Sequence, residues 1–323
     1  MEFDWDTLEE LRASYLDGSA GAAGDYWKSD SLLRGYDATF ARRIAWKWQW
    51  VLLELERRGW SPPPGTLVDY GCGTGVAARE VLEKYSGAGL TQAALYDRSP
   101  RALKFATETV RREFPGVTVE ARLPAATGLL LVSHVLPELD EAGTAELLKL
   151  AESAQAVIFV EPGTREVSRR LIDLRQKLSG VMKPVAPCFH SGQCGLLTPE
   201  NDRHWCHFFA PAPNVVYTDS DWVHFGRIMG IDLRSLPLSF LVMDRREPAP
   251  APGGTVRVLG KPRLYKGYVL FQGCDAGGVA EKRLMKRTDP QYFRAAHKYR
   301  TSTVQRWETE GTEIKKVEEP DSQ

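Results

Sequence analysis

The middle of the chain repeats one pattern, in which a short apolar run is followed by a longer segment with apolar residues at helical spacing. Short β-prone apolar runs are typical of buried strands, and apolar residues three and four apart predict a helix that faces a core. Strands are expected at residues 66–70, 93–97, 117–123, 128–139 (running into a helix start) and 156–164, with helices at 76–85, 101–114, 141–154 and 165–180. Strands that alternate with helices predict a parallel sheet with helical crossovers.

Before this repeat, residues 1–60 are expected to form an N-terminal helical region. Two segments, 4–16 and 38–59, carry apolar and aromatic residues at helical spacing. Trp46, Trp48 and Trp50 lie in the second segment. We favour core packing of these rings against the sheet over a stacking platform for bases.

A glycine loop, Asp69-x-Gly71-x-Gly73-x-Gly75, separates the first strand from its helix. Glycine lets a ligand come close to the backbone, and the start of the helix offers unpaired N–H groups. The loop has neither the G-x-G-x-x-G of dinucleotide sites nor the G-K-[ST] ending of phosphate loops. Asp69 would repel a phosphate. Asp97, at the end of the second strand, is placed to accept hydrogen bonds from a ribose diol.

In these features the sequence resembles the class I S-adenosylmethionine-dependent methyltransferases over about residues 61–180. The resemblance rests on the segments LVDYGCGTG, ALYDRS, LLVSHVLPEL and VIFVEPGT. It implies that the loop of Asp69, Gly71, Gly73 and Gly75 approaches the methionine part of the cofactor and that Asp97 holds the ribose hydroxyls. The alternative is that the loop is only a tight turn, which the position of Asp97 disfavours.

Two segments depart from the pattern of that superfamily. The stretch after the third strand, ARLPAATG, has no acid or amide to pair with the adenine amine. The fourth strand ends in SHVLPEL in place of the Asn/Asp-Pro-Pro-Tyr/Phe box of amino-group methyltransferases. No catalytic residue is therefore assigned. His134 either faces the pocket or is a hydrogen-bonded structural residue.

Composition and charge narrow the classes of function. The chain has 323 residues, 43% of them apolar and 26% charged, and no apolar run is long enough to span a bilayer. Its acidic N-terminus does not resemble a secretory or transit signal, so a cytoplasmic location is expected. Although 42 Lys and Arg balance 42 Asp and Glu, residues 257–306 hold twelve basic and three acidic residues. This segment is either a phosphate-facing surface or a solvated face.

Cysteines are few but clustered. Cys72 fits the glycine loop as a small side chain, which leaves Cys188, Cys194 and Cys206 close together and Cys274 apart. Disulfides are not expected in a cytoplasmic protein of this size. Two readings remain, isolated thiols or a metal site with four thiolates. Zinc usually has closely spaced C-x2-4-C pairs, although a histidine among 190, 204 and 207 can replace a thiolate, and an iron–sulfur cluster tolerates looser spacing.

The segments PCFHSGQC, WCHF, RVLGKPRLYKGYVLFQGC and KRTDPQYFRAAHKYR, after a methyltransferase domain, resemble the family of methyltransferase-like small-ribosomal-subunit assembly factors, known from mitochondria and bacteria. The resemblance spans roughly residues 30–300. It implies that Cys188, Cys194, Cys206 and Cys274 hold a [4Fe-4S] cluster, with zinc as the alternative metal. It also implies binding to the small ribosomal subunit and its ribosomal RNA.

The predicted fold class is therefore α/β, a class I methyltransferase Rossmann-like sheet of seven strands with an N-terminal helical region and a cysteine-rich metal-binding insertion. The expected divisions are the helical region 1–60, the S-adenosylmethionine-binding core 61–180, the insertion 181–236, the last strands with a basic region 237–306, and a disordered tail 307–323. Strand six is expected at 238–246 and strand seven at 266–274.

The predicted function is an S-adenosylmethionine-binding protein that acts in small-subunit assembly or translation, binds no membrane, and is a monomer by default. Methyl transfer, to ribosomal RNA for example, is favoured. The alternatives are a methyltransferase for a small molecule or protein with structural zinc, and a scaffold without catalysis.

Overall fold

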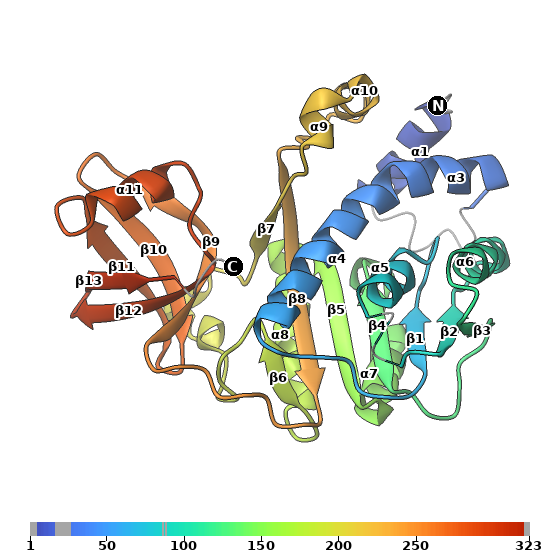
Figure 1. The fold of residues 1–323 in the computed structure, drawn as a ribbon, viewed down its shortest axis with the longest axis horizontal. Coiled ribbons are helices and arrows are strands. Elements are labelled where there is room, and N and C mark those ends of the chain that lie inside the picture. Colours follow the sequence, from blue (N-terminus) through green and yellow to red (C-terminus); the bar gives the residue numbers. More distant parts are fainter. Residues whose placement is uncertain (1–4, 17–26, 86, 88, 320–323) are drawn as a thin grey trace.

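The computed structural model describes residues 5–16, 27–85, 87 and 89–319. These residues form two lobes, a layered α/β lobe and a smaller β-barrel lobe, which lies at the left of Figure 1. Within the described residues, no helix has both the length and the apolar character that crossing a membrane requires.

The α/β lobe is built on an 8-stranded sheet with the order β3-β2-β1-β4-β5-β8-β6, and β7 pairs with one end of β8. The first five strands are parallel, whereas β8 is antiparallel to its neighbours β5, β6 and β7. This order, with an antiparallel strand inserted beside the fifth, is that of the class I methyltransferase fold and confirms the predicted α/β fold. The predicted number of seven strands is wrong, because β7 adds an eighth strand by pairing with β8. The strands are β1 (Leu67–Tyr70), β2 (Gln92–Tyr96), β3 (Thr118–Glu120), β4 (Leu129–Ser133), β5 (Ala156–Pro162), β6 (Lys183–Ala186), β7 (Phe208–Pro211) and β8 (Ser235–Asp244).

Helices cover both faces of this sheet (Figure 1). Leu129 and Leu131 of β4 face the core under three helices, and Leu130 and Val132 face a second core under two others. This division follows from the alternation of side chains along a strand. The first set is α4 (Phe40–Arg57), α5 (Val76–Lys84) and α6 (Pro100–Glu113), and the second is α7 (Glu141–Ser153) and α8 (Arg165–Leu178). The predicted helices are confirmed within a few residues.

The N-terminal residues are helical, as predicted. They form α1 (Trp5–Leu16), α3 (Asp30–Ala38) and α4. Trp48 is fully buried, Trp46 packs on Trp222, and Trp50 packs on Phe208. These contacts confirm that the tryptophans belong to the core.

Part of the predicted insertion belongs to the sheet, because β6 and β7 both pair with β8. Between them the chain makes two short 3₁₀ turns, η2 (Gly195–Leu197) and η3 (Pro199–Asn201). After β7 come two short helices, α9 (Val215–Thr218) and α10 (Ser220–Ile228). The cysteine segment is thus anchored by a strand at each end.

The barrel lobe is a separate fold that closes in the order β10-β11-β13-β12-β9. Its core holds Val256, Val269, Phe271 and Trp307. Gly273 allows this packing, since a Cβ there would lie 2.5 Å from the Trp307 ring. The elements are β9 (Thr255–Leu264), β10 (Tyr268–Asp275), β11 (Gly278–Met285), α11 (Pro290–His297), β12 (Val304–Glu310) and β13 (Glu313–Glu318).

Two predictions about this part of the chain are wrong. Strand six corresponds to β8, but the expected strand seven at 266–274 is β10 of the barrel and does not pair with the sheet. The expected disordered tail from 307 is ordered as far as 319, because β12 and β13 supply the pairings that close the barrel. Residues 320–323 of that tail lie outside the described residues.

Candidate functional site

The glycine loop lies at the carboxyl end of β1, where the chain enters α5. Gly71, Gly73 and Gly75 have φ angles of 70°, 53° and 80°, a region that favours glycine. A Cβ on Gly71 would lie 2.5 Å from Val135, and one on Gly75 would lie 3.2 Å from Ala106. A Cβ on Gly73 would meet nothing within 4 Å. Packing therefore requires the first and third glycines, while the second faces open space that a ligand can enter.

The two predicted carboxylates bind the backbone of this region. Asp97 accepts hydrogen bonds from the N–H groups of Gly73 at 2.8 Å and Ser99 at 2.9 Å. Asp69 is fully buried and accepts one from Ala78 N–H at 3.0 Å. Burial raises the pKa of Asp69 to about 7. The structure therefore brings all five predicted cofactor residues into one loop system.

A pair of tyrosines beside the loop was not predicted from the sequence. Tyr70 ends β1, Tyr96 ends β2, and their rings stack with centroids 5.2 Å apart at 25°. Tyr96 is 37% exposed. An exposed aromatic ring at this edge of a sheet suits contact with a purine. The available signal was the position of each tyrosine, directly before the loop or before Asp97.

The carboxyl ends of β4 and β5 carry a buried polar cluster that reaches α4. Lys47 Nζ lies 3.4 Å from His134 Nε2, and the pKa of Lys47 is lowered to about 7 by burial and by Arg43. His134 has φ of 58°, which is uncommon outside glycine and is often found at functional sites. Glu161 accepts from Val135 N–H at 3.1 Å, and burial raises its pKa to about 8.

The interpretation of His134 as a hydrogen-bonded residue agrees with its contact with Lys47. Burial and the adjacent Lys47 lower the pKa of His134 well below its usual range, so its imidazole is neutral. A lysine with a pKa of about 7 can accept a proton near neutral pH, while His134 remains neutral beside it. Sequence reasoning missed Lys47 because it lies on a helix distant in the chain.

The four clustered cysteines meet at a second place, where the α/β lobe contacts the barrel. Cys188 follows β6, Cys194 precedes η2, Cys206 precedes β7, and Cys274 lies in β10. All four line one cavity of about 40 Å³. The predicted convergence is therefore observed, but the fourth cysteine comes from the barrel and not from the methyltransferase sheet.

Arginines hold the cysteine segment in place by donating to its carbonyl oxygens. Arg169 of α8 donates to the carbonyls of Leu196, His204 and two neighbouring residues. Arg58 donates to the carbonyl of Cys188 at 3.1 Å, and Arg175 to that of His190 at 2.8 Å. A backbone fixed by side chains from two helices positions the thiols without a regular element of its own.

The thiols are free and largely buried. Burial and the neighbouring cysteines raise the pKa of Cys206 well above its usual range and that of Cys274 to about 12. Among the described residues, no group of three or more His, Cys, Asp or Glu side chains is arranged to hold a single metal ion. Cys72 is buried apart from these thiols, inside the glycine loop, as expected.

The three histidines of the segment have different surroundings. His207 stacks on Trp205 with centroids 4.4 Å apart and packs under Gly260. His204 lies beside Arg203 and is half-buried. His190 lines the cavity with the four thiols. Only His190 is therefore placed to replace a thiolate as a ligand.

A sequence model of the family described as "Mitochondrial small ribosomal subunit Rsm22" matches residues 48–302. The chain belongs to the Rsm22 family. The match covers both the glycine loop and the four cysteines. With the strand order of the sheet, it places this Rsm22-family protein among the class I methyltransferase-like proteins. No curated protein matches the sequence.

Several solved methyltransferases are distantly similar to this Rsm22-family chain. One from Leishmania major, described as a SAM-dependent methyltransferase, is 14% identical, with 71% of this chain and 82% of that chain covered and a TM-score of 0.41. The plantazolicin methyltransferase BpumL in complex with SAH is 11% identical, with 74% and 99% covered and a TM-score of 0.38. The strand order, and not these distant similarities, identifies the fold.

Proposed function

We propose that this protein binds S-adenosylmethionine at the glycine loop, binds ribosomal RNA of the small subunit, and acts in assembly of that subunit or in translation. The observation that carries the cofactor assignment is the loop itself. Three left-handed glycines, one of them facing open space, stand at the carboxyl end of a parallel strand beside Asp97 and exposed Tyr96. Ligands of open α/β sheets bind at this edge.

Methyl transfer is part of the proposal, with Lys47 as the group that accepts a proton from the acceptor. A lysine buried beside His134 with a pKa of about 7 is partly neutral at physiological pH, as a general base must be. S-adenosylmethionine would supply the methyl group. The proton stays on Lys47, where Glu161 in its ionised form stabilises the protonated lysine, and His134 can accept a hydrogen bond from the lysine.

The four-cysteine site fits a [4Fe-4S] cluster, which we include in the proposal. Four thiols line one cavity, and the raised pKa values of Cys206 and Cys274 reflect burial and the neighbouring thiols, so thiolates there would require a cation. Arg175 also lines the cavity, and Arg257 lowers the pKa values of Cys206 and Cys274 against the larger effect of burial. Such a cluster would tie the segment around Cys188 to strand β10 and so fasten the barrel to the α/β lobe.

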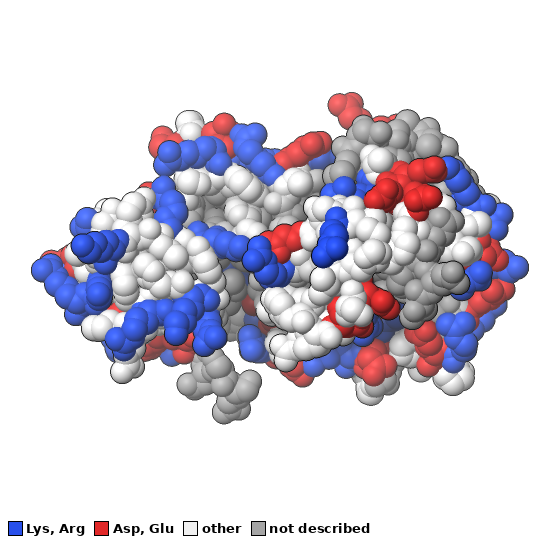
Figure 2. Space-filling view, turned by 90° about the horizontal axis from the view of Figure 1, so that it is seen from above, with Lys and Arg blue, Asp and Glu red and all other residues white. Residues whose placement is uncertain are grey.

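Electrostatics supports the RNA partner. The barrel, residues 255–318, contains 14 Lys and Arg and 7 Asp and Glu, while the whole chain is neutral. Lys and Arg gather on the barrel lobe, at the left of Figure 2, whereas the larger lobe shows both signs. A basic lobe on a neutral protein suits a polyanion.

The cofactor and metal are tested on protein purified without oxygen. We expect about four iron and four sulfide per chain with a broad visible absorbance, and S-adenosylmethionine binding in calorimetry that is lost in Asp97→Ala. The Cys206→Ser variant should lose iron while retaining cofactor binding. One zinc per chain and no iron would show that the cluster assignment is wrong. A calorimetric titration with S-adenosylmethionine that shows no heat of binding would contradict the cofactor assignment.

Methyl transfer and RNA binding are tested together on small ribosomal subunits. Binding should fall steeply as salt rises, and label from methyl-tritiated S-adenosylmethionine should enter the RNA with wild type but not with Lys47→Met. Binding without any label transfer would favour the scaffold alternative. Failure to bind subunits at low salt would contradict the proposed partner.

A further inference from the structure

The barrel has the connectivity of an OB-fold. Strands β9, β10 and β11 form an antiparallel meander, β11 and β13 pair in parallel, and β12 pairs with both β13 and β9. Helix α11 connects β11 to β12, and its Phe293 and Ala296 join the barrel core. OB-folds bind oligonucleotides on the outer face of their second and third strands, which here are β10 and β11. Because a fold alone does not fix a ligand, the side chains on that face must be considered.

The strand register places charged side chains on the outer face of β10 and β11. Val269 and Phe271 point into the core, so Tyr268 and Leu270 point outward. Leu270 stands between Arg263 of β9 and Arg283 of β11, both exposed. At the other end of the same face, Cys274 is buried against the α/β lobe. Only the end near the β9–β10 turn is therefore free to meet a ligand.

Two tyrosines at this turn form an exposed aromatic platform. Tyr265 and Tyr268 stack with centroids 4.5 Å apart at 15°, and Tyr265 is 40% exposed. The Arg283 guanidinium lies 5.9 Å from the Tyr268 ring centroid, and Lys266 between the tyrosines is exposed. Exposed aromatic rings next to cations are the usual elements of single-strand binding, in which bases stack and phosphates meet the charges.

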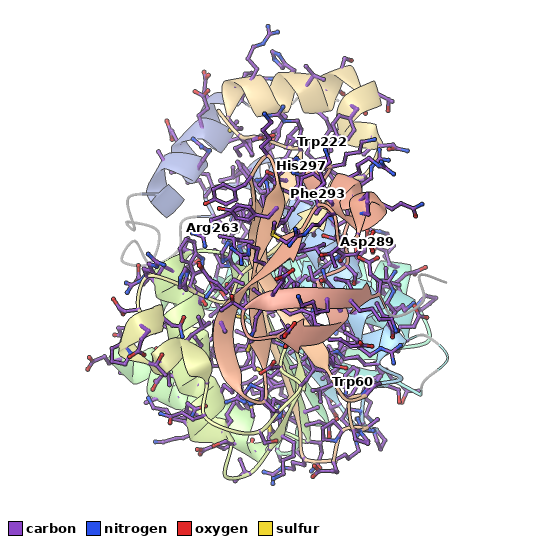
Figure 3. All side chains as sticks on the ribbon, turned by 90° about the vertical axis from the view of Figure 1, so that its left-hand side faces the viewer. Trp60, Trp222, Arg263, Asp289, Phe293 and His297 are labelled. Carbon is purple, nitrogen blue, oxygen red and sulfur yellow. The ribbon has the colours of Figure 1, made fainter. Side chains whose placement is uncertain are left out.

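Basic and acidic residues are distributed unequally around the barrel. Residues 257–306 hold twelve basic and three acidic residues, whereas 307–319, which include most of β12 and β13, hold two basic and five acidic residues. Figure 3 shows Arg263 at the left side of the barrel strands, and its charge acts on His204 of the cysteine segment. The side formed by β12 and β13 would repel a polyanion, so the charge favours β9, β10 and β11.

We propose that a tyrosine–arginine face, made of Arg263, Tyr265, Lys266, Tyr268 and Arg283, binds single-stranded RNA. Bases stack on the two tyrosines, and phosphates contact Lys266 and Arg283. Arg263 forms an ion pair with Glu281 and borders the face. The proposal rests on the RNA partner of the proposed function and assigns the binding to one surface.

A rival surface is the cleft of about 1900 Å³ between the two lobes. It is lined by Tyr217 and Tyr299, which are 57% and 55% exposed, and by Lys261. Eight Lys and Arg line it in all, against four acidic residues, Glu54, Asp244, Glu247 and Glu319. Charge therefore does not separate the cleft from the barrel face; the stacked tyrosine pair beside Arg283 favours the barrel face, and Tyr217 of the cleft supplies a matched aromatic control.

The test measures fluorescence anisotropy of a labelled oligouridylate of about 12 nucleotides, a length within the range bound by one OB-fold. Full-length protein purified without oxygen is compared with Tyr265→Ala/Tyr268→Ala, which should bind at least about tenfold more weakly. Arg283→Ala should reduce the slope of log affinity against log salt by about 0.7. A duplex of the same length should bind more weakly than the single strand.

Two controls separate this face from general electrostatics and from the cleft. Lys104→Ala/Arg112→Ala removes two exposed charges from the other lobe and should leave affinity within about twofold, because charges beyond a Debye length are screened. Tyr217→Ala should also bind normally. Since Tyr265 is exposed, its variants are expected to fold. Near-ultraviolet circular dichroism, which reports on the packing of the remaining aromatic residues, checks this.

The outcomes distinguish this proposal from the proposed function. If wild type binds RNA and the double tyrosine variant binds equally well, the face is wrong but the RNA partner stands. Loss of binding in Tyr217→Ala instead would move the site to the cleft. If wild type binds small subunits but not the oligonucleotide, single-strand recognition is wrong. Binding to neither would contradict both proposals.

Discussion

The two lobes of this protein differ in how their paired strands are connected along the chain. In the α/β lobe, β1 pairs with β2 and β4 pairs with β5, each across one intervening helix. In the barrel, the parallel pair β11 and β13 and the pair β9 and β12 bring together strands separated by α11 and other strands. Helical crossovers connect most neighbours among the first five strands of the α/β lobe, and β8 then pairs with β5 across the cysteine segment. The barrel closes only when its last two strands, β12 and β13, pair with β9 and β11.

The most severe test of this comparison removes the last two strands. A chain ending at Thr303 lacks β12 and β13, including the buried side chains of Trp307 and Ile314. We expect the barrel to lose its fold while the α/β lobe remains folded. Hydrogen exchange followed by mass spectrometry should show amides of β9 to β11 losing protection by several orders of magnitude, since their open state becomes dominant.

The control is a chain ending at Glu319, which keeps every described barrel strand. It should exchange like the full-length protein. Retained protection of β10 in the shorter chain would show that the barrel does not depend on closure. Loss of protection in β4 as well would show that the two lobes unfold as one unit.

The same difference explains what could be predicted from the sequence. The strands around Asp69 and Asp97 were predicted because each is a short apolar run with a helix behind it, and the glycine spacing fixed the ligand edge. The run at 266–274 was equally clear as a strand, but nothing local shows that it pairs with β9 and β11 in a separate barrel. Register across long separations is set by packing that a single sequence does not display.

The candidate sites divide in the same way. Gly71, Gly73, Gly75 and the four cysteines carry chemistry in their residue type and spacing, so they could be predicted. Lys47 could not, because its low pKa arises from burial against Arg43 and the strand ends, and an α-helical lysine is normally solvated. Residue type and spacing therefore predict which residues bind the cofactor or metal, whereas the pKa of a buried group such as Lys47 follows only from its surroundings in the fold.

A second test concerns the buried ion pair that joins the lobes. Arg257 of β9 is 2% exposed and pairs with Glu54 of α4, and it also donates to Pro187 and Thr303. Replacing Arg257 by Met should lower the free energy of unfolding by about 3 kcal/mol, because Glu54 is left buried with one fewer partner. Urea unfolding followed by tryptophan fluorescence measures this loss.

The matched variant removes both charges. Glu54→Gln/Arg257→Met should be destabilised by less than the sum of Glu54→Gln and Arg257→Met, since each single change already breaks the pair between these two residues. Arg58 also pairs with Glu54 and limits the effect of the single change. A double variant that loses the full sum of the two single changes would show that the pair is not coupled, and the lobes would then be joined chiefly by other contacts.

A third test uses the titration of Lys47, which belongs to the α/β lobe alone. Burial, then Arg43, lowers its pKa to about 7 from its usual value of 10.5. Between these two pKa values the unfolded chain binds more protons than the folded chain, so Lys47 makes the free energy of unfolding rise with pH from about 7 to 10.5. Below pH 7 the lysine is charged in both states, and the full cost of burying its charge lowers the stability.

Lys47→Met should remove that dependence. Relative to wild type, the variant should gain about 2 kcal/mol more at pH 6.5 than at pH 9 in urea unfolding. Glu161, with a raised pKa, acts in the opposite direction at lower pH and is present in both proteins. Lys84→Met on the surface of α5 is the control, and its stability should show no comparable change. Equal differences at both pH values would contradict a buried, titrating Lys47.

The smallest expected effect distinguishes the two roles of glycine in the loop. Gly71→Ala would place a Cβ 2.5 Å from Val135, while Gly73→Ala meets nothing within 4 Å, and both residues have positive φ. The left-handed backbone costs each variant about 1 kcal/mol, and the clash adds to this in Gly71→Ala. Thermal unfolding without ligand should therefore place Gly71→Ala below Gly73→Ala.

Affinity for S-adenosylmethionine should separate the pair in the other direction. The new Cβ in Gly73→Ala enters the open space beside Asp97 and Tyr96, so calorimetry should show affinity weakened about tenfold, equivalent to about 1.4 kcal/mol. If Gly73→Ala binds the cofactor as well as wild type, that space is not where the ligand approaches. The loop would then be a packing turn, and the α/β lobe, like the barrel, would owe its glycines to folding alone.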